Sequence, residues 1–235
     1  MKRTFYTNEF YHLFDRGVEK RKIFYQESDK IRFIHNLYEF NDLKPAPAFS
    51  RRFNPKKNVR NRVSYISSER KPLINLHAFV LMPNHYHLLS EQIKREGISL
   101  FMRKINVGHT NSTNLKYKRS GHLFQGPFKH VYIGRNFQLA HLVCYLHSNP
   151  LDIWKPNWKE RRLSALEMKK ALKFLESYRW SSHLDYLGIK NFPSLINTEF
   201  LFKFFGGPRG YRKFFIDWLK QYLKNIKSVN ELILE

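Results

Sequence analysis

The chain has 235 residues, of which 42% are hydrophobic and 16% aromatic, so it can bury a core and is not disordered throughout. Lys and Arg total 42 against 19 Asp and Glu, and this net charge of +23 favours binding to nucleic acid or an anionic membrane. No apolar run approaches the roughly 20 residues of a membrane-spanning helix, and residues 1–12 lack the apolar core of a signal peptide. The single cysteine, Cys144, excludes an intrachain disulfide and a cysteine-based zinc site, which suits a reducing cytoplasm.

Hydrophobic periodicity predicts strands and helices in a definite order over the first two thirds of the chain. We expect a strand at 10–15, a helix at 28–40 and, at 73–91, either two short strands or one strand with a bulge at Pro83. A helix at 99–115, a strand at 123–133 and a helix at 138–148 follow, the last stopped by Pro150. This order predicts an α+β fold with helices packed on an antiparallel sheet.

Two segments differ from the rest in composition. Residues 44–71 hold nine basic residues, one acid and three prolines, which predicts a cationic insertion that either contacts DNA or is a solvated loop. Residues 156–235 predict a small C-terminal helical extension after a first domain at 1–155. We expect most of the aromatic rings of this extension to lie in its core rather than to stack on bases: Trp180, Phe200, Phe204, Phe205, Tyr211, Phe214, Phe215 and Trp218.

His85 and His87 form the first candidate for chemistry. Residues two apart in a strand point to the same face, so both imidazoles can reach one metal ion. A single His-x-His pair is weak support among 11 histidines, and a purely structural role is the alternative.

The predicted helix at 138–148 carries a second candidate. His141, Tyr145 and Asn149 are four apart and therefore lie on one line of the helix, beside its apolar stripe. Considered without other evidence, this pattern is better explained by structural roles: Asn149 caps the helix and Tyr145 lies at the boundary of the core.

Carboxylates are missing where a metal-dependent nuclease would often place them. No Asp or Glu occurs between Glu96 and Asp152. A nuclease with two metals held by clustered carboxylates, or a glycosidase-like carboxylate pair, is therefore disfavoured in this segment. The remaining possibility is a site in which a nucleophile other than a carboxylate works beside a metal held by His and amide oxygen.

Five ordered blocks resemble the single-tyrosine HUH transposases, in which HUH denotes His, a bulky hydrophobic residue and His. The run LMPNHYHLL (81–89) is very similar to the signature strand of this family, and YLHSNP (145–150) resembles its nucleophile helix. YHLFDRGVEKRKIF (11–24), GHLFQGPFKHVYI (121–133) and YRWSSHLDYLG (178–188) resemble its opening strand, its Gly-His-Leu-Phe-Gln-Gly strand and a downstream Trp-Ser-Ser segment. Together the blocks resemble the REP-associated tyrosine transposase branch.

This resemblance implies a ferredoxin-like or RRM-like HUH fold and a role for individual residues. Tyr145 would be the nucleophile, and His85, His87 and Asn149 would hold a divalent metal, Mg²⁺ or Mn²⁺, with Zn²⁺ or Ni²⁺ as substitutes. Asn149 takes the place of the glutamine of minimal insertion-sequence members. His141 is a candidate catalytic helper, with a solvent-facing histidine as the alternative. Pro127-Phe128 stands where the family often has Arg-Tyr, and the insertion is longer than the family leads us to expect.

The implied reaction is cleavage of single-stranded DNA at hairpin-forming repeats, through a 5′-phosphotyrosine link, for transposition or repeat processing. We expect a cytoplasmic, nucleoid-associated protein without a membrane partner, either monomer or homodimer. The alternatives are a hairpin or single-stranded DNA-binding protein without catalysis, and a His-ligated metal hydrolase for a small substrate, which the charge disfavours. Taken one at a time, the basic residues expected to contact DNA are equally well explained as solvent-exposed surface charges. They are Arg16, Arg103, Lys104, Lys116, Lys118, Arg119 and Lys129.

Overall fold

The computed structural model describes residues 3–44, 70–134, 136–160 and 163–223. Its first six main elements follow the order strand, helix, strand, strand, helix, strand: β1 (Phe10–Arg16), α1 (Glu27–Glu39), β2 (Ile74–Met82), β3 (His85–Gln92), α3 (Gly97–Tyr117) and β4 (Lys129–Ile133). Mainly helical elements follow: α4 (Asn136–Ser148), α5 (Leu151–Trp154), α6 (Ala165–Ser177), α7 (His183–Tyr186), α8 (Glu199–Phe205) and α9 (Gly207–Tyr222). Two short 3₁₀ helices, η1 (Val18–Lys20) and η4 (Trp158–Glu160), complete the described chain.

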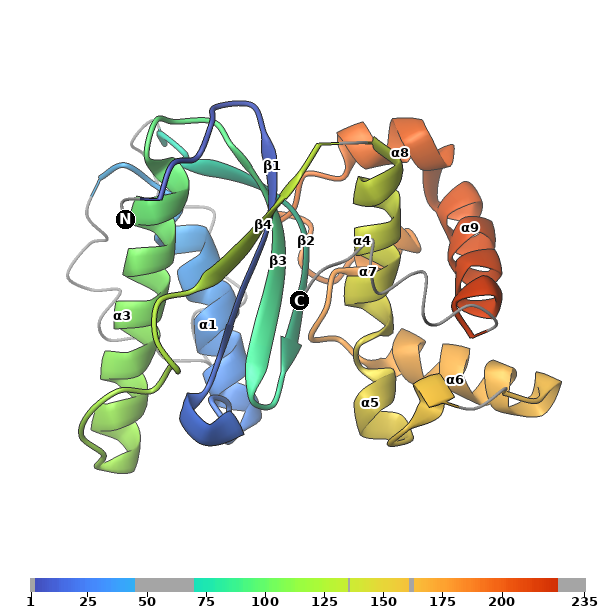
Figure 1. Cartoon of the computed structure of the whole chain (residues 1–235), viewed down its shortest axis with the longest axis horizontal. Coiled ribbons are helices and arrows are strands. Elements are labelled where there is room, and N and C mark those ends of the chain that lie inside the picture. Colours follow the sequence, from blue (N-terminus) through green and yellow to red (C-terminus); the bar gives the residue numbers. More distant parts are fainter. Residues whose placement is uncertain (1–2, 45–69, 135, 161–162, 224–235) are drawn as a thin grey trace.

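The four strands form one antiparallel sheet in the order β2-β3-β1-β4. This order and the β-α-β-β-α-β succession are those of the ferredoxin-like arrangement. The predicted α+β class, with helices packed on an antiparallel sheet, is therefore confirmed. Helices α1 and α3 cover one face of the sheet, and α4 with the C-terminal helices covers the other (Figure 1).

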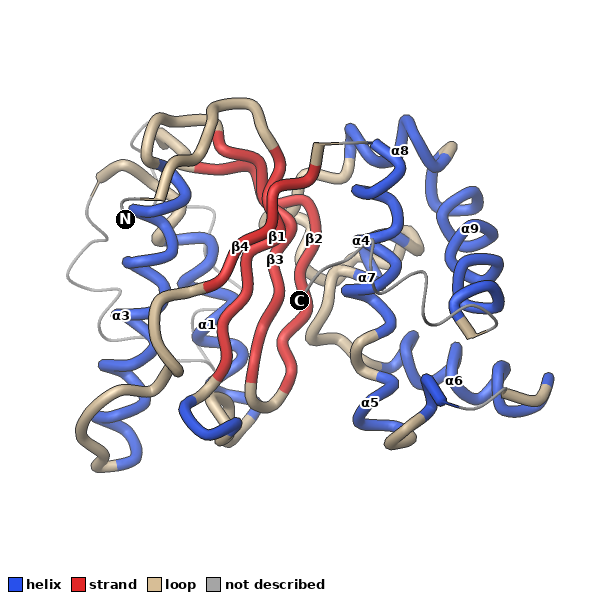
Figure 2. The backbone as a smooth tube through the Cα atoms, viewed as in Figure 1, coloured by secondary structure: helices blue, strands red, loops and turns tan. Residues whose placement is uncertain are grey.

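Most predicted elements are present, with one clear error. The segment at 73–91 is a hairpin of two strands that turns at Pro83 and Asn84, not one bulged strand. The strand expected at 123–133 is wrong in its first half, since β4 begins only at Lys129 (Figure 2). Gly126, at φ 148°, and Pro127, which has no N–H to donate, interrupt it, and a single bridge between Gly17 and Phe124 remains upstream.

The C-terminal helices share a core with the sheet. Buried residues from β2, α4 and α9, such as Val80, Leu142 and Phe215, belong to one apolar cluster. The segment before α7 also pairs with the outer edge of β2, because Leu81 N donates to Trp180 O and Ser182 N donates to Phe79 O. This edge is thereby covered, and the apolar cluster contains residues from both sides of position 155.

Five of the eight C-terminal aromatic residues expected in the core are buried: Trp180, Phe205, Tyr211, Phe215 and Trp218. Phe214 is half-buried, whereas Phe200 and Phe204 are 39% and 45% exposed. The predicted cationic insertion at 44–71 lies, apart from its ends, outside the described residues. Among the described residues, no helix combines the length and apolarity needed to cross a membrane.

A buried polar network ties α4 to the C-terminal helices. The Tyr211 hydroxyl on α9 lies 2.7 Å from His147 Nδ1 on α4 and 2.6 Å from His183 Nδ1 on α7. His147 Nε2 lies 2.7 Å from Ser182 Oγ, which accepts a hydrogen bond from Phe79 N of β2. Because polar atoms buried without partners are costly, this network fixes the position of α4 relative to the sheet.

Removing the central hydroxyl of this network tests its contribution. We expect Tyr211→Phe to lower the free energy of unfolding by about 1–3 kcal/mol, because two buried imidazoles lose a partner. Urea unfolding followed by circular dichroism measures the change. Tyr6→Phe, at a side chain that is 66% exposed, is the matched control and is expected to leave stability unchanged. Equal stability of both variants and the wild type would contradict the role of the network.

Buried neutral histidines predict how stability depends on pH. Burial lowers the pKa of His109 to about 4 and that of His183 to about 3, from 6.5. Between pH 6.5 and these values the unfolded chain binds protons that the folded chain does not, so the free energy of unfolding rises with pH. Over this pH range, each imidazole raises the free energy of unfolding by on the order of 3 kcal/mol.

Asp15 acts in the opposite direction, because burial raises its pKa from 3.8 to about 6, but the histidines outnumber it. We therefore expect stability to increase from about pH 4 to about pH 7 in urea unfolding measured across this range. A flat profile, or greater stability in acid, would show that these imidazoles are solvated or paired in their charged form.

Candidate active site between β3 and α4

His85 and His87 lie at the start of β3, where the hairpin turn fixes the strand. The loop after β1 holds this turn, since Gly17 N donates to Asn84 O and Ile23 N donates to Pro83 O. A Cβ at residue 17 would lie 2.2 Å from Arg21 O, so the tight approach of this loop requires glycine. The two imidazole rings lie 4.9 Å apart, centroid to centroid, and nearly perpendicular. His87 is buried and His85 is half-buried.

Helix α4 brings Tyr145 and Asn149 to the same place. The Tyr145 ring lies 6.1 Å from the His87 ring in an edge-to-face arrangement. The Asn149 side chain lies close enough to His85 to influence the pKa of that imidazole. Both Asn149 N and Asn149 Nδ2 donate to Tyr145 O, at 3.2 and 2.9 Å, where the helix ends before Pro150. The structure therefore gathers four of the sequence-predicted residues at one site, with Asn149 also acting as a helix cap.

Further hydrogen bonds set the orientation of both imidazoles. His85 Nδ1 lies 2.7 Å from Asn84 Oδ1, and because an amide oxygen only accepts, the ring proton sits on Nδ1 and the lone pair on Nε2. His87 Nδ1 lies 2.8 Å from Nε2 of His12, a buried residue of β1. For His87 to offer the lone pair of Nε2, its Nδ1 would carry the proton and donate to His12.

The surroundings keep these imidazoles neutral. Burial, followed by the positive charge of Arg16, lowers the pKa of His85 to about 4. Burial also lowers the pKa of His87 well below its usual value, and His12, His85, Arg16 and Lys159 act in the same direction. The ammonium of Lys159 also lies 5.8 Å from the centre of the Tyr145 ring. The site therefore combines neutral nitrogen donors with two nearby cations, of which Lys159 pairs with Asp152 at 3.2 Å.

The donor set fits a divalent cation. Two neutral imidazoles with fixed Nδ1 partners, and the amide of Asn149 beside them, are ligands that metals accept, and outer partners such as Asn84 and His12 are typical of metal-binding histidines. Among the described residues, no cluster of three or more His, Cys, Asp or Glu side chains is placed to hold a metal. Any metal at this site would therefore depend on the amide and on solvent or substrate oxygens.

The predicted DNA-contacting cations do not gather around the site. Arg16 ends β1, and its charge acts on both metal-candidate histidines. Lys129 begins β4 at the other edge of the sheet. The remaining five belong to α3 or follow it directly, on the sheet face opposite α4: Arg103, Lys104, Lys116, Lys118 and Arg119.

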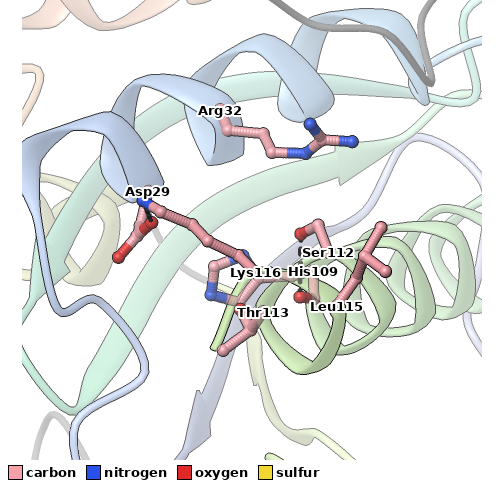
Figure 3. Close-up of a pocket in the computed structure, with 7 residues that line it drawn as sticks. All are labelled: Asp29, Arg32, His109, Ser112, Thr113, Leu115 and Lys116. Carbon is pink, nitrogen blue, oxygen red and sulfur yellow. Dashed lines mark hydrogen bonds and ion pairs between the residues drawn. The ribbon is translucent and has the colours of Figure 1, made fainter. Parts of the chain in front are cut away.

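Two of these cations have partners within the fold. Lys116 Nζ donates to Asp29 Oδ1 at 2.6 Å, across a pocket between α1 and α3 (Figure 3). Lys104 Nζ donates to the backbone oxygens of Asp42 and Lys44. These two side chains therefore contribute to holding α3 against neighbouring segments.

His141, the candidate helper, faces away from the histidine pair. Its Nδ1 accepts a hydrogen bond from Trp218 Nε1 at 2.9 Å, and its ring packs on Phe137 and Phe214. The contacts that the structure gives His141 thus belong to α4 and α9 rather than to β3.

Sequence reasoning did not single out His12, Asn84 or Lys159. His12 and Asn84 lie in two of the quoted sequence blocks, and alternation along β1 places His12 on the same face as Phe14, which pairs with His87 in the sheet. The neighbourhood of Lys159 and Tyr145 carries no comparable sequence signal, because it depends on how the chain folds back after α5.

Comparisons with known proteins add one similarity. No family model and no curated protein matches this chain. Among solved structures, the chain is similar to one described as "Structure of the REP associates tyrosine transposase bound to a REP hairpin". The two share 13% sequence identity with a TM-score of 0.49, and the match covers 82% of this chain and 87% of that chain.

Proposed function

We propose that this protein is a metal-dependent endonuclease and strand transferase that cleaves single-stranded DNA at hairpin-forming repeats through a covalent 5′-phosphotyrosine intermediate. The observation that carries the proposal is the meeting of Tyr145 with the imidazoles of His85 and His87 and the amide of Asn149. Tyr145 lies 58 positions after His87 in the sequence, yet the fold brings a candidate nucleophile and candidate metal ligands together in one place.

The proposed reaction is a transesterification, which needs no ATP or other energy source. The Tyr145 oxygen attacks the phosphorus of a phosphodiester, an O–P bond to tyrosine forms, and the bond from phosphorus to the 3′ oxygen breaks. The phenol loses its proton and the departing 3′ oxygen gains one, so the net products are a 5′-phosphotyrosine link and a free 3′-hydroxyl. Because one phosphodiester replaces another, the step is reversible and strands can be rejoined.

His85, His87 and Asn149 would hold the divalent cation that this chemistry uses. Held there, Mg²⁺ or Mn²⁺ would supply Lewis-acid chemistry toward a non-bridging phosphate oxygen. A free tyrosine has a pKa of about 10, so activation of the nucleophile is needed near neutral pH. Lys159 is a cation beside the nucleophile, since its ammonium lies 5.8 Å from the centre of the Tyr145 ring and 3.2 Å from Asp152 Oδ2.

Charge supports a DNA substrate. The net charge of +23 favours a polyanion, and the cations Arg16 and Lys159 lie near enough to His85 and His87 to lower the pKa of both imidazoles. The absence of Asp and Glu between Glu96 and Asp152 means that the α4 segment itself adds no negative charge to repel the backbone. A small-molecule hydrolase would gain nothing from this distribution.

Loss of the phenol oxygen tests the nucleophile. We expect Tyr145→Phe to abolish the covalent protein–DNA adduct, because phenylalanine has no oxygen to attack phosphorus. Labelled single-stranded hairpins from the flanks of the gene, incubated with Mn²⁺ and separated on a denaturing gel, measure the adduct. Tyr132→Phe is the matched control, since Tyr132 is 52% exposed and contacts Tyr11 and Glu9 rather than the histidine pair.

The outcomes separate this proposal from a binding protein without catalysis. An adduct that persists in Tyr145→Phe would assign the nucleophile to another residue. A wild-type protein that binds the hairpin but forms no adduct with any divalent ion would favour the alternative, a catalytically inactive hairpin-binding protein.

Metal binding is tested through the partner of His87. We expect His12→Phe to weaken Mn²⁺ binding by about 10- to 100-fold, because His87 loses the group that orients its ring. Titration calorimetry measures the affinity in the absence of DNA. His130→Phe is the control, because this half-buried imidazole on β4 packs against Phe5 and Phe128 instead. Equal Mn²⁺ affinity in both variants and the wild type would argue against the histidine ligand set.

A further inference from the structure

A groove outside the candidate active site runs between α4, α8 and α9. We call it the α4–α9 groove. It encloses about 450 Å³ and is lined mainly by aromatic side chains from all three helices. This volume falls within the range of pockets that bind small organic ligands. The histidine pair on β3 does not contribute to it, so the groove needs its own explanation.

Several of these rings are accessible to a ligand. Phe137 is 55% exposed and Phe204 is 45% exposed, whereas His141 and Phe214 are half-buried between them. The centroids of Phe137 and His141 lie 4.0 Å apart, and those of Phe204 and Phe214 lie 6.1 Å apart. Exposed rings supported from below by packed rings present flat faces that nucleobases can stack on.

The groove also offers polar groups of the right kind. Because Trp218 Nε1 donates to His141 Nδ1, the proton of the neutral imidazole sits on Nε2, which is a hydrogen-bond donor. Lys213 adds a positive charge to the lining, and the carboxylate of Asp217 is compensated by Lys220 at 3.8 Å. A ligand with a flat ring, hydrogen-bond acceptors and a negative backbone matches this combination.

The position of the groove links it to Tyr145. Phe137, His141 and Tyr145 are four residues apart along α4, so each step is about 6 Å by the rise of the helix. The groove therefore opens about 12 Å from Tyr145 along the same helix. A DNA strand bound at Tyr145 reaches it within a few nucleotides.

We propose that the α4–α9 groove binds unpaired bases of the single-stranded DNA that flanks the scissile phosphate, by stacking on Phe137 and Phe204 with Lys213 on the backbone. The inference rests on the function proposed above. It adds a site for the flanking strand, separate from the site of cleavage, and it assigns the exposed rings of the C-terminal extension to DNA.

The test uses the full chain and two DNA hairpins that differ only in the length of the single-stranded flank. One flank ends next to the cleavage site, and the other extends past it far enough to reach the groove. We expect the double variant with Phe137→Ala and Phe204→Ala to bind the long-flank DNA more weakly than the wild type does. Each base that no longer stacks on a ring should weaken the affinity by about 5- to 150-fold. We expect binding of the short-flank DNA, measured in the same anisotropy titration, to stay unchanged.

Phe200→Ala is the matched control, because Phe200 is 39% exposed on the same helix as Phe204 but stacks on Phe10, outside the groove. Thermal unfolding checks that all variants fold. Equal binding of the long flank by the double variant and the wild type would overturn the proposal, and so would equal weakening for both DNAs.

A third result would also overturn the proposal. If the double variant changes the oligomeric state in sedimentation, a second copy of the chain occupies the groove instead of DNA. Adduct formation on the short-flank DNA tests the proposed function separately. The cleavage proposal fails if the wild type forms no adduct there, and the groove proposal fails only on the difference between the two flanks.

Discussion

Helix α4 packs across β2 and β3, and the whole candidate site depends on this packing. Apolar residues of α4 share a core with Val80 and Leu89 of the sheet, and this contact places Asn149 against His85 and Tyr145 beside His87. A rotation of α4 by one residue would turn these side chains by about 100° and separate them from the histidines. The geometry of the candidate site is thus set by how one helix packs on one sheet face.

The C-terminal helices stabilise that position. Tyr211 and His183 contact His147, which lies between Tyr145 and Asn149 on α4, and Ser182 connects His147 to β2. An extension that the composition suggests is an addition is therefore part of the framework of the site.

The candidate site combines burial with nearby positive charge. Burial lowers the pKa of His85 and His87, which keeps both rings neutral and able to donate lone pairs, while Arg16 and Lys159 bring positive charge to the same place. A phosphate needs the second property and a metal needs the first. The predicted cations of α3 lie on the opposite face of the sheet and therefore do not add charge next to His85 and His87.

Local periodicity determined much of this from the sequence. Alternation along a strand put His85 and His87 on one face, and the spacing of four put Tyr145 and Asn149 on one line of a helix, because side-chain direction follows directly from backbone geometry. The same reasoning gave the element order and hence the α+β class. It failed at 123–128, where Gly126 and Pro127 outweigh the apolar pattern. It could not show that the ring of His141 pairs with Trp218.

Only the tertiary structure decided which face of the sheet α4 covers and which distant residues join the site. His12 lies 75 positions from His87, and its contact arises from the pairing of β1 with β3. Lys159 and the α4–α9 groove likewise depend on how the helices after α4 fold back. Such contacts come from the burial of apolar surface summed over many residues, and that sum has no local signature in the sequence.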